Sequence, residues 1–362
     1  MKESFPNVVV GRGAGGAPPN RFEKIHVDAD LEQLADDDEL LAPERRIKTQ
    51  FFVDASQTIL ATNDSPDVGF NYSVNPYRGC EHGCAYCYAR PGHEYLGFDA
   101  GLDFETKIMV KLDAAKLLRR ELSKPSWNGG ELIALSGVTD CYQPAERHFR
   151  LTRGVLEVML EARQVTSIIT KNALLARDLD LLAPLAEQRL LTVSLSVTTL
   201  DHEVARTLEP RTSTPAAKLA AIRKLSAAGV PVNVMVAPIV PGLTDHEVPK
   251  ILEAAADAGA TSAGFVLLRL PHAVKPIFLD WAERNYPDRR AKIEGLIRET
   301  RDGKLYQTEW GTRQRGTGPY AEQIQQTFAL FVRKFKLDRR LPEHDHSLFR
   351  PPQQTSGQMS LF

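Results

Sequence analysis

The stretch Asn75-Pro76-Tyr77-Arg78-Gly79-Cys80-Glu81-His82-Gly83-Cys84-Ala85-Tyr86-Cys87-Tyr88 places three cysteines in a C-x3-C-x2-C spacing. Cysteine thiolates are the usual ligands of iron-sulfur clusters, and a four-iron cluster normally takes four of them, one for each iron. A loop that offers three thiolates therefore predicts a cluster whose fourth iron has no cysteine ligand. That iron is open to a small molecule.

Two other interpretations of this loop use the same residues. His82 or His93 is close enough in the sequence to complete a zinc site with the three cysteines, although structural zinc sites usually pair C-x2-C units or end in a histidine pair. The cysteines can also be three buried thiols without a metal, but the loop is rich in glycine and charge and lacks apolar periodicity. We therefore prefer the iron-sulfur interpretation.

This loop, with Tyr86 directly before its last cysteine, resembles the radical S-adenosylmethionine (SAM) superfamily. The resemblance implies a 4Fe-4S cluster held by Cys80, Cys84 and Cys87, and SAM bound to the open iron through its amino and carboxylate groups. It also implies reductive cleavage of SAM to a 5′-deoxyadenosyl radical. An electron donor such as flavodoxin or ferredoxin is expected as a partner.

The composition is that of a globular protein. The 362 residues are 43% hydrophobic and 25% charged, and the formal net charge is −1. No apolar run is long enough to cross a membrane and no signal peptide is recognisable, so we expect a cytoplasmic protein. Three of the four cysteines share one loop, which is typical of a reducing compartment.

Near-neutral charge neither requires nor excludes a nucleic-acid partner. Basic residues gather at 289–292 and 333–340.

Four regions are predicted along the chain. Residues 1–45, rich in glycine and then in acidic residues, form a mostly disordered arm. Residues 46–270 comprise a lead-in segment and a domain of alternating strands and helices. Residues 271–345 form a helical extension, and residues 346–362 a flexible tail.

The alternating region predicts an α/β fold with a parallel sheet and right-handed crossovers. A partial (β/α)6 barrel is also what the radical SAM resemblance implies, and its reactive residues would collect at the C-terminal ends of the strands. The expected strands are 70–74, 132–136, 166–170, 191–197, 230–237 and 264–268. The expected helices are 112–122, 151–163, 174–187, 215–228, 245–258, 291–298 and 320–336.

The ends of the later strands should hold SAM, as the resemblance implies. Gly129-Gly130-Glu131 spells the usual amino-group motif but precedes its strand, so we interpret it as a turn. Lys171 is placed to pair with the SAM carboxylate, and His93 and Glu94 are placed either to contact substrate or to brace the cluster loop. The expected SAM-binding residues are Tyr86, Thr139, Asp140, Lys171, Ser196, Thr198 and Pro238.

Five stretches of the chain, within roughly residues 70 to 270, resemble the branch of radical SAM proteins related to spore photoproduct lyase: Asn-Pro-Tyr-Arg-Gly-Cys, Thr-Asp-Cys-Tyr-Gln-Pro, Thr-Lys-Asn, Leu-Glu-Pro-Arg and Ala-Pro-Ile-Val-Pro-Gly. The resemblance implies a radical enzyme that acts on DNA or another nucleic acid in repair. The lyase has a hydrogen-donor cysteine where Gly137 stands here, and Cys141 is a displaced candidate for that role. The alternatives are a radical SAM enzyme with a protein or metabolite substrate, and a non-catalytic zinc or iron-sulfur protein.

The last five residues, Gln358-Met359-Ser360-Leu361-Phe362, follow a stretch rich in Pro, Gln, Ser and Gly. Exposed apolar residues at the end of a flexible spacer are poorly explained by folding. The pentapeptide resembles the bacterial sliding-clamp binding motif, which implies a replication clamp as a partner. The alternative is a tail that packs on its own domain.

Overall fold

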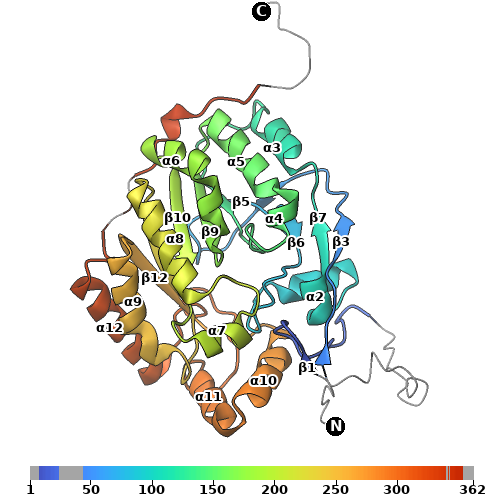
Figure 1. Ribbon diagram of the computed structural model, residues 1–362, viewed down its shortest axis with the longest axis vertical. Helices are drawn as coiled ribbons and strands as arrows, with labels where there is room; N and C mark the ends of the chain where they lie inside the picture. The colour runs from blue at the N-terminus through green and yellow to red at the C-terminus, as the bar shows by residue number, and fades with distance from the viewer. Residues whose placement is uncertain (1–7, 24–43, 340, 342, 354–362) are drawn as a thin grey trace, which may run out of the picture.

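The computed structural model describes residues 8–23, 44–339, 341 and 343–353. Its centre is a seven-stranded sheet in the order β12-β11-β10-β9-β8-β5-β4 (Figure 1). Six strands that follow one another along the chain are neighbours and parallel, which confirms the predicted partial (β/α)6 barrel. They are β5 (Tyr72–Val74), β8 (Ile133–Leu135), β9 (Thr166–Thr170), β10 (Leu191–Ser196), β11 (Val232–Ile239) and β12 (Ser262–Leu267).

Helices pack on the outer face of this sheet (Figure 1). β11 shows why the sheet has two different faces, because Val232, Val234 and Val236 are buried while Asn233 and Met235 between them are only partly buried. Apolar side chains of alternate residues therefore face the helices. The covering helices are α3 (Ala114–Leu122), α5 (Leu151–Ala162), α6 (Leu179–Glu187), α8 (Pro215–Ala227) and α9 (Val248–Asp257).

Local signals fix the ends of several of these helices. Thr214 caps α8 by accepting a hydrogen bond from the amide of Ala217, and Pro215 occupies the first helical position. Gly229 and Gly259 follow α8 and α9 with φ of +77° and +97°. These left-handed conformations favour glycine and confirm the two predicted C-terminal caps.

The C-terminal extension is helical, as expected, but it contains one more helix than the sequence indicated. α10 (Val274–Asn285) precedes α11 (Pro287–Glu299) and α12 (Gly318–Lys334). Among the described residues, no helix is both long and apolar enough to span a membrane. Two short helices, α4 (Glu146–Phe149) and α7 (His202–Leu208), also lie after strands β8 and β10.

Several short elements were not expected from the sequence. β4 (Leu60–Thr62) runs antiparallel to β5 at one edge of the main sheet. A separate sheet contains β3 (Gln50–Val53), β7 (Lys107–Val110) and β6 (Tyr77–Arg78), and α2 (Leu102–Thr106) leads into it. The remaining short elements are β1 (Val8–Val9), β2 (Glu44–Arg45) and the 3-10 turns η1 (Arg90–Leu96), η2 (Ala173–Asp178), η3 (Asp245–Glu247) and η4 (His346–Leu348).

The prediction of a mostly disordered N-terminal arm is wrong for residues 8–23, which we call the N-terminal strap. Arg12 and Asn20 of the strap are buried. Arg12 donates to the backbone oxygen of Glu105 at 2.8 Å, and Asn20 donates to the backbone oxygen of Glu94 at 3.0 Å. The strap is ordered by polar contacts to distant residues, and such contacts leave no periodic signal in the sequence.

The expected flexible tail also differs from the structure in its first half. Arg350 and Gln353 bond to the last two residues of α5: the amide of Arg350 donates to the backbone oxygen of Ala162 at 2.9 Å, and that of Gln353 to the Glu161 carboxylate at 2.9 Å. Residues 346–353 therefore pack on the barrel. The terminal peptide 358–362 lies outside the described residues.

Candidate active site

The cysteine loop begins just after β5, at the C-terminal end of the barrel strand, where the fold rule places reactive groups. The amide of Cys80 donates to the backbone oxygen of Phe104 at 2.8 Å, and that of Ala85 donates to Leu208 at 3.0 Å. Gly79 and Gly83 take φ of +78° and +64°. These left-handed turns explain the two glycines next to the first two cysteines.

The three cysteines lie close to one another in a sheltered position. Cys80 and Cys84 are buried and Cys87 is partly buried. Burial, together with the charges of Asp140, Cys87 and Cys84, raises the pKa of Cys80 well above its usual value. Thiolates at such positions need a cation to balance their charge, and the iron of a cluster supplies it. The donor set therefore fits an iron-sulfur cluster.

The zinc interpretation has weaker support from the geometry. His82 forms an ion pair with Asp140 at 3.4 Å, and its other ring nitrogen contacts Asn172 at 3.1 Å. His93 packs between Phe98 and Phe104, 5.1 and 5.6 Å from their ring centroids. Within the described part of the chain, no three cysteine, histidine or acidic side chains are arranged around one ion. A cluster does not need that arrangement, because each thiolate binds a different iron.

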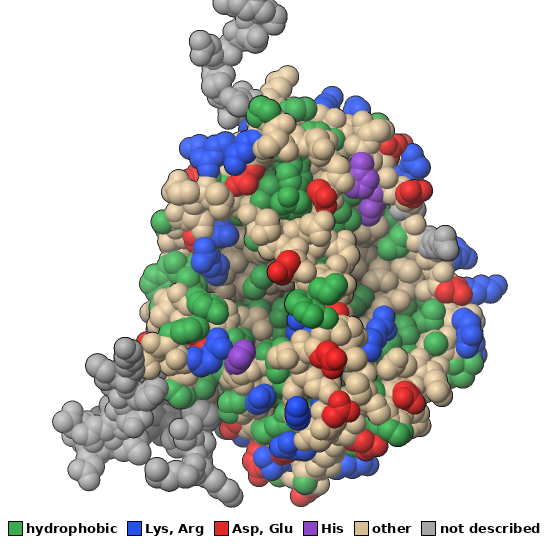
Figure 2. Space-filling view, turned by 180° about the vertical axis from the view of Figure 1, so that it is seen from behind, with side chains coloured by type: hydrophobic (Ala, Val, Ile, Leu, Met, Phe, Trp, Pro, Cys, Tyr) green, Lys and Arg blue, Asp and Glu red, His purple; other side chains and the backbone are tan. Residues whose placement is uncertain are grey.

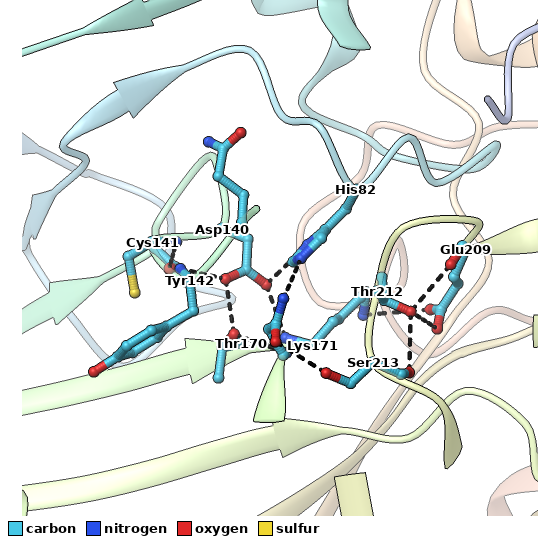
Figure 3. Close-up of polar contacts among 12 residues, drawn as sticks. His82, Asp140, Cys141, Tyr142, Thr170, Lys171, Glu209, Thr212 and Ser213 are labelled. Carbon is cyan, nitrogen blue, oxygen red and sulfur yellow. Dashed lines mark hydrogen bonds and ion pairs between the residues drawn. The ribbon is translucent and has the colours of Figure 1, made fainter. Parts of the chain in front are cut away.

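Cys141 does not join the other cysteines. Its side chain is fully buried in the main hydrophobic core. In Figure 3 its sulfur turns away from the pair formed by Asp140 and His82. Burial also raises the pKa of this thiol well above its usual value. The structure therefore does not place Cys141 where we expected a displaced hydrogen donor, and gives it a packing role.

Asp140 organises the strand ends next to the cluster loop (Figure 3). One carboxylate oxygen accepts from the Thr170 hydroxyl at 2.7 Å, and the other accepts from the Lys171 amide at 2.8 Å and faces His82. Although burial opposes it, His82 holds the pKa of Asp140 below its usual value. Asp140 thus fixes His82 of the loop to the end of β9. The sequence indicated Asp140 but missed His82 and Asn172 in this network.

Glu209 is the centre of a second buried network. Its carboxylate accepts from the hydroxyls of Tyr86 and Thr198, the latter at 2.6 Å, and from the Lys218 ammonium at 2.7 Å. Although burial works to raise it, Lys218 and Lys171 bring the pKa of Glu209 down to about 2. Glu209 is therefore an anion that holds Tyr86 of the cluster loop against the ends of the strands. No pattern in the sequence indicated that Lys218, in the first turn of α8, is its buried partner.

Lys171 lies directly between these two networks. Its ammonium donates to the backbone oxygen of Ala237 at 3.0 Å, lies 3.9 Å from Glu209, and sits 5.7 Å from the centroid of the Tyr86 ring. Its side chain remains 18% exposed. The predicted carboxylate partner of SAM is therefore beside the cluster loop and accessible.

The other predicted SAM-binding residues have mixed surroundings. Thr139 is buried and its hydroxyl donates to the backbone oxygen of Tyr77 at 2.8 Å, so it stabilises the loop. Ser196 ends β10 and is buried, and Thr198 follows it. Pro238 is buried within β11, one residue from the oxygen that accepts from Lys171. Glu131 of the Gly-Gly-Glu turn accepts from Asn71 at 3.1 Å, away from these groups.

His93 and Glu94 brace the loop and the strap. Glu94 is fully buried and pairs with Arg21 of the strap at 2.6 Å. Burial lowers the pKa of His93 to about 4, so this histidine is neutral at pH 7. Of the two roles that the sequence left open for this pair, the structure favours bracing.

The N-terminal strap reaches the cluster loop through a buried ion pair that the sequence did not indicate. Arg90 donates to the backbone oxygen of Cys84 at 2.9 Å and pairs with Glu105 at 2.5 Å. The same Glu105 carboxylate accepts from the amides of Gly13 at 3.2 Å and Ala14 at 2.9 Å. A Cβ on Gly13 would lie 1.9 Å from the backbone oxygen of Gly83. The strap therefore lies directly on the loop.

Comparison with known proteins agrees with this arrangement. The family model described as the radical SAM superfamily matches residues 74–255. An uncharacterised protein of Mycobacterium tuberculosis is 42% identical over 231 residues, which cover 63% of this chain and 68% of that protein. An uncharacterised protein of Methanocaldococcus jannaschii is 28% identical over 179 residues, 49% of this chain and 64% of that protein.

Among solved structures, spore photoproduct lyase in complex with dinucleoside spore photoproduct has a similar fold, with a TM-score of 0.54 and 17% identity. The match covers 87% of this chain and 85% of the lyase. The family match spans half of the chain and contains the cysteine loop and the strand ends described above. The chain belongs to the radical SAM superfamily, whose enzymes use a 4Fe-4S cluster and SAM.

Proposed function

We propose that Cys80, Cys84 and Cys87 hold a 4Fe-4S cluster whose fourth iron binds SAM, and that the enzyme acts on a nucleic acid. One observation carries the first part. The chain has four cysteines, and the fourth, Cys141, is fully buried in the hydrophobic core. No cysteine is left to occupy the fourth iron, which therefore stays open to SAM.

When both are bound, the cluster and SAM supply a 5′-deoxyadenosyl radical after reduction by one electron. The residues of the chain position SAM and exclude water. Lys171 pairs with the SAM carboxylate, because it is an accessible cation beside the loop. Tyr86 and Thr198, fixed by Glu209, line the side of the site at the end of β10. Such fixed polar groups select one substrate position for a radical that attacks most C–H bonds.

The nucleic-acid part of the proposal rests on the sequence resemblance to the lyase branch. The lyase with a similar fold has been solved with dinucleoside spore photoproduct. Gly137 argues against the same reaction here. It stands where the lyase has its donor cysteine, and a Cβ at this position would lie 2.8 Å from the Cβ of Ser73. A donor cysteine does not fit at residue 137 without a shift of β5. We therefore propose a nucleic-acid substrate and a different radical reaction.

Deuterium transfer tests the substrate class. The reconstituted, reduced protein is incubated with SAM and oligonucleotides deuterated at their sugar and base carbons, and 5′-deoxyadenosine is analysed by mass spectrometry. Transfer of deuterium into 5′-deoxyadenosine is expected. SAM cleavage without transfer from DNA or RNA would favour the protein or metabolite alternative.

Two partners complete the proposal. A one-electron donor such as flavodoxin or ferredoxin reduces the cluster, because radical SAM enzymes need a reductant. The peptide 358–362 docks on the bacterial sliding clamp, a prediction that rests on its sequence alone. Full-length protein should be retained by immobilised clamp, and protein that ends at residue 357 should not be. Equal retention of both forms would contradict the clamp prediction.

A further inference from the structure

Arg269 is a cation at the mouth of the barrel that the functions described so far do not use. It lies two residues after the end of β12, much as Lys171 lies one residue after the end of β9. Its guanidinium lies 5.8 Å from the centroid of the Tyr88 ring. Tyr88 comes directly after Cys87, and its hydroxyl donates to the backbone oxygen of Gly137 at 2.9 Å. Arg269 therefore lies beside the cluster loop, on the side of β8 and β12.

The guanidinium of Arg269 has no hydrogen-bond or ion-pair partner within the described residues. The Nε atom is buried without a hydrogen bond. Arg301 and Asp67 are close enough to interact with its charge, and Asp67 is already paired with Arg313. Arg301 is a cation, and the charge of Asp67 is already balanced. A partly buried guanidinium without an acceptor is costly, and a phosphate or carboxylate offers the matching oxygens.

Two exposed aromatic rings lie in this region: Tyr88 contacts Arg269 itself, and Trp310 belongs to the loop that bonds to Asp67, a neighbour of Arg269. Tyr88 is 52% exposed and Trp310 is 50% exposed. The guanidinium of Arg313 stacks on Trp310 at 3.8 Å from the ring centroid, and Arg313 also donates to Ser65 at 2.6 Å. Both rings are thus held in place while about half of each side chain stays exposed. Fixed aromatic faces beside cations are typical of surfaces on which nucleobases stack.

The loop that carries Trp310 spans the two edges of the barrel. At the last strand, the amide of Leu267 donates to the backbone oxygen of Gln314 at 2.9 Å. At the connection before β5, Asp67 accepts from the amide of Gly311 at 2.7 Å. Trp310 therefore lies where the first and last strands of the open sheet are bridged, and the bridge ends near Arg269.

We propose that Arg269 binds a phosphodiester of a single-stranded or unpaired nucleic acid while Tyr88 and Trp310 stack the adjacent bases. This inference rests on the proposed function and names the subsite at which the substrate is recognised. A carboxylate metabolite would satisfy the guanidinium, but it would leave the two exposed ring faces unused. Figure 2 shows acidic and basic side chains intermixed on the face of the molecule that it presents, and the formal net charge is −1, so a local site is more consistent with this protein than a broad basic surface.

Binding of a fluorescent single-stranded oligothymidylate tests the proposal. Fluorescence anisotropy is measured at several salt concentrations with reconstituted wild-type protein, Arg269→Gln and Arg223→Gln. Arg223 is an exposed residue of α8 and controls for the change in net charge. We expect Arg269→Gln to weaken binding about tenfold or more and to reduce the salt slope by about 0.7, the value of one phosphate contact to a single strand. Trp310→Ala should weaken binding about fivefold or more through lost stacking.

The outcomes separate this site from the proposed function. If the wild type does not bind the oligonucleotide, both the nucleic-acid substrate and this subsite are wrong. If the wild type binds and Arg269→Gln equals Arg223→Gln in affinity and salt slope, only the assignment of Arg269 is wrong. SAM affinity, measured by calorimetry, should be the same in Arg269→Gln and the control. A selective loss of SAM binding would assign the guanidinium to SAM and overturn the proposal.

Discussion

At the scale of single residues, the iron content of alanine variants at Cys84 and Cys141 tests which cysteines bind the cluster. Cys84→Ala removes one of three thiolates on the loop, so we expect reconstituted protein to lose most of its iron, sulfide and brown absorbance. Cys141→Ala is the matched control, because its sulfur packs in the core. It should keep full iron content and lose about 1 kcal/mol of unfolding free energy from the small cavity. Equal iron loss in both variants would contradict the assignment.

Lys171 tests the SAM carboxylate site without disturbing the cluster. Lys171→Gln removes one charge-assisted contact, worth about 1.5–3 kcal/mol, and should weaken SAM binding about ten- to hundredfold. Iron content should stay normal. Lys224→Gln, on the exposed side of α8, controls for the change in charge. Calorimetric titration with SAM under anaerobic conditions measures both variants, and equal affinities would remove Lys171 from the site.

The depressed pKa of Glu209 predicts an acid-dependent loss of stability. A carboxylate with a pKa of about 2 in the folded protein and about 4.3 when unfolded stabilises the fold fully above pH 4.3. As the pH falls from about 4.3 to 2, about 3 kcal/mol of unfolding free energy should be lost. Urea unfolding of cluster-free protein at pH 6 to 3 measures the start of this loss.

Glu209→Gln provides the comparison. The variant leaves Lys218 buried without a charge partner, so it should be less stable at neutral pH by about 3–5 kcal/mol. It should also lose the pH dependence that belongs to this carboxylate. Identical slopes of stability against pH in the two proteins would show that Glu209 is not the titrating anion.

The sequence predicted residue positions better than residue contacts. The spacing of the cysteines indicated their common loop, and the strand ends indicated Lys171 and Asp140. The network around Asp140 was out of reach, because two of its members, His82 and Asn172, are 90 positions apart and meet only in the folded chain. Thr139 was expected at SAM and instead bonds to Tyr77, since a hydroxyl in a loop often satisfies a nearby backbone group.

At the scale of elements, the N-terminal strap is the main feature that the sequence did not predict. Its glycines and prolines carry no periodicity, and its partner Glu105 lies 92 residues from Gly13. Gly13 is required because its backbone touches Gly83 of the cluster loop. The strap should therefore hold the loop around Cys84 in place through Glu105 and Arg90.

A single methyl group tests this role. Gly13→Ala should displace the strap, because the new Cβ would collide with the backbone oxygen of Gly83. We expect a loss of about 1–3 kcal/mol in unfolding free energy and faster bleaching of the cluster in air. Gly92→Ala, where a Cβ meets nothing within 4 Å, is the control. Equal bleaching rates in the two variants would contradict a protective role for the strap.

At the scale of the whole molecule, alternating hydrophobic runs indicated the six parallel strands and their order, because each crossover returns the chain to the same end of the sheet. They did not indicate how the open edges of the partial barrel are joined. That closure depends on Asp67, Gly311 and Arg313, which pair residues more than 240 positions apart. Single polar contacts of this kind have no signature in local sequence patterns.

The central claim is that three cysteines hold a cluster whose fourth iron is open to SAM. Its most direct test is the formation of 5′-deoxyadenosine and methionine by anaerobically reconstituted, reduced protein that contains about four iron and four sulfide per chain. We predict that both products form with wild-type protein and Cys141→Ala, that they require the reductant, and that they are absent with Cys84→Ala. Fully loaded, reduced wild-type protein that leaves SAM intact would contradict the account.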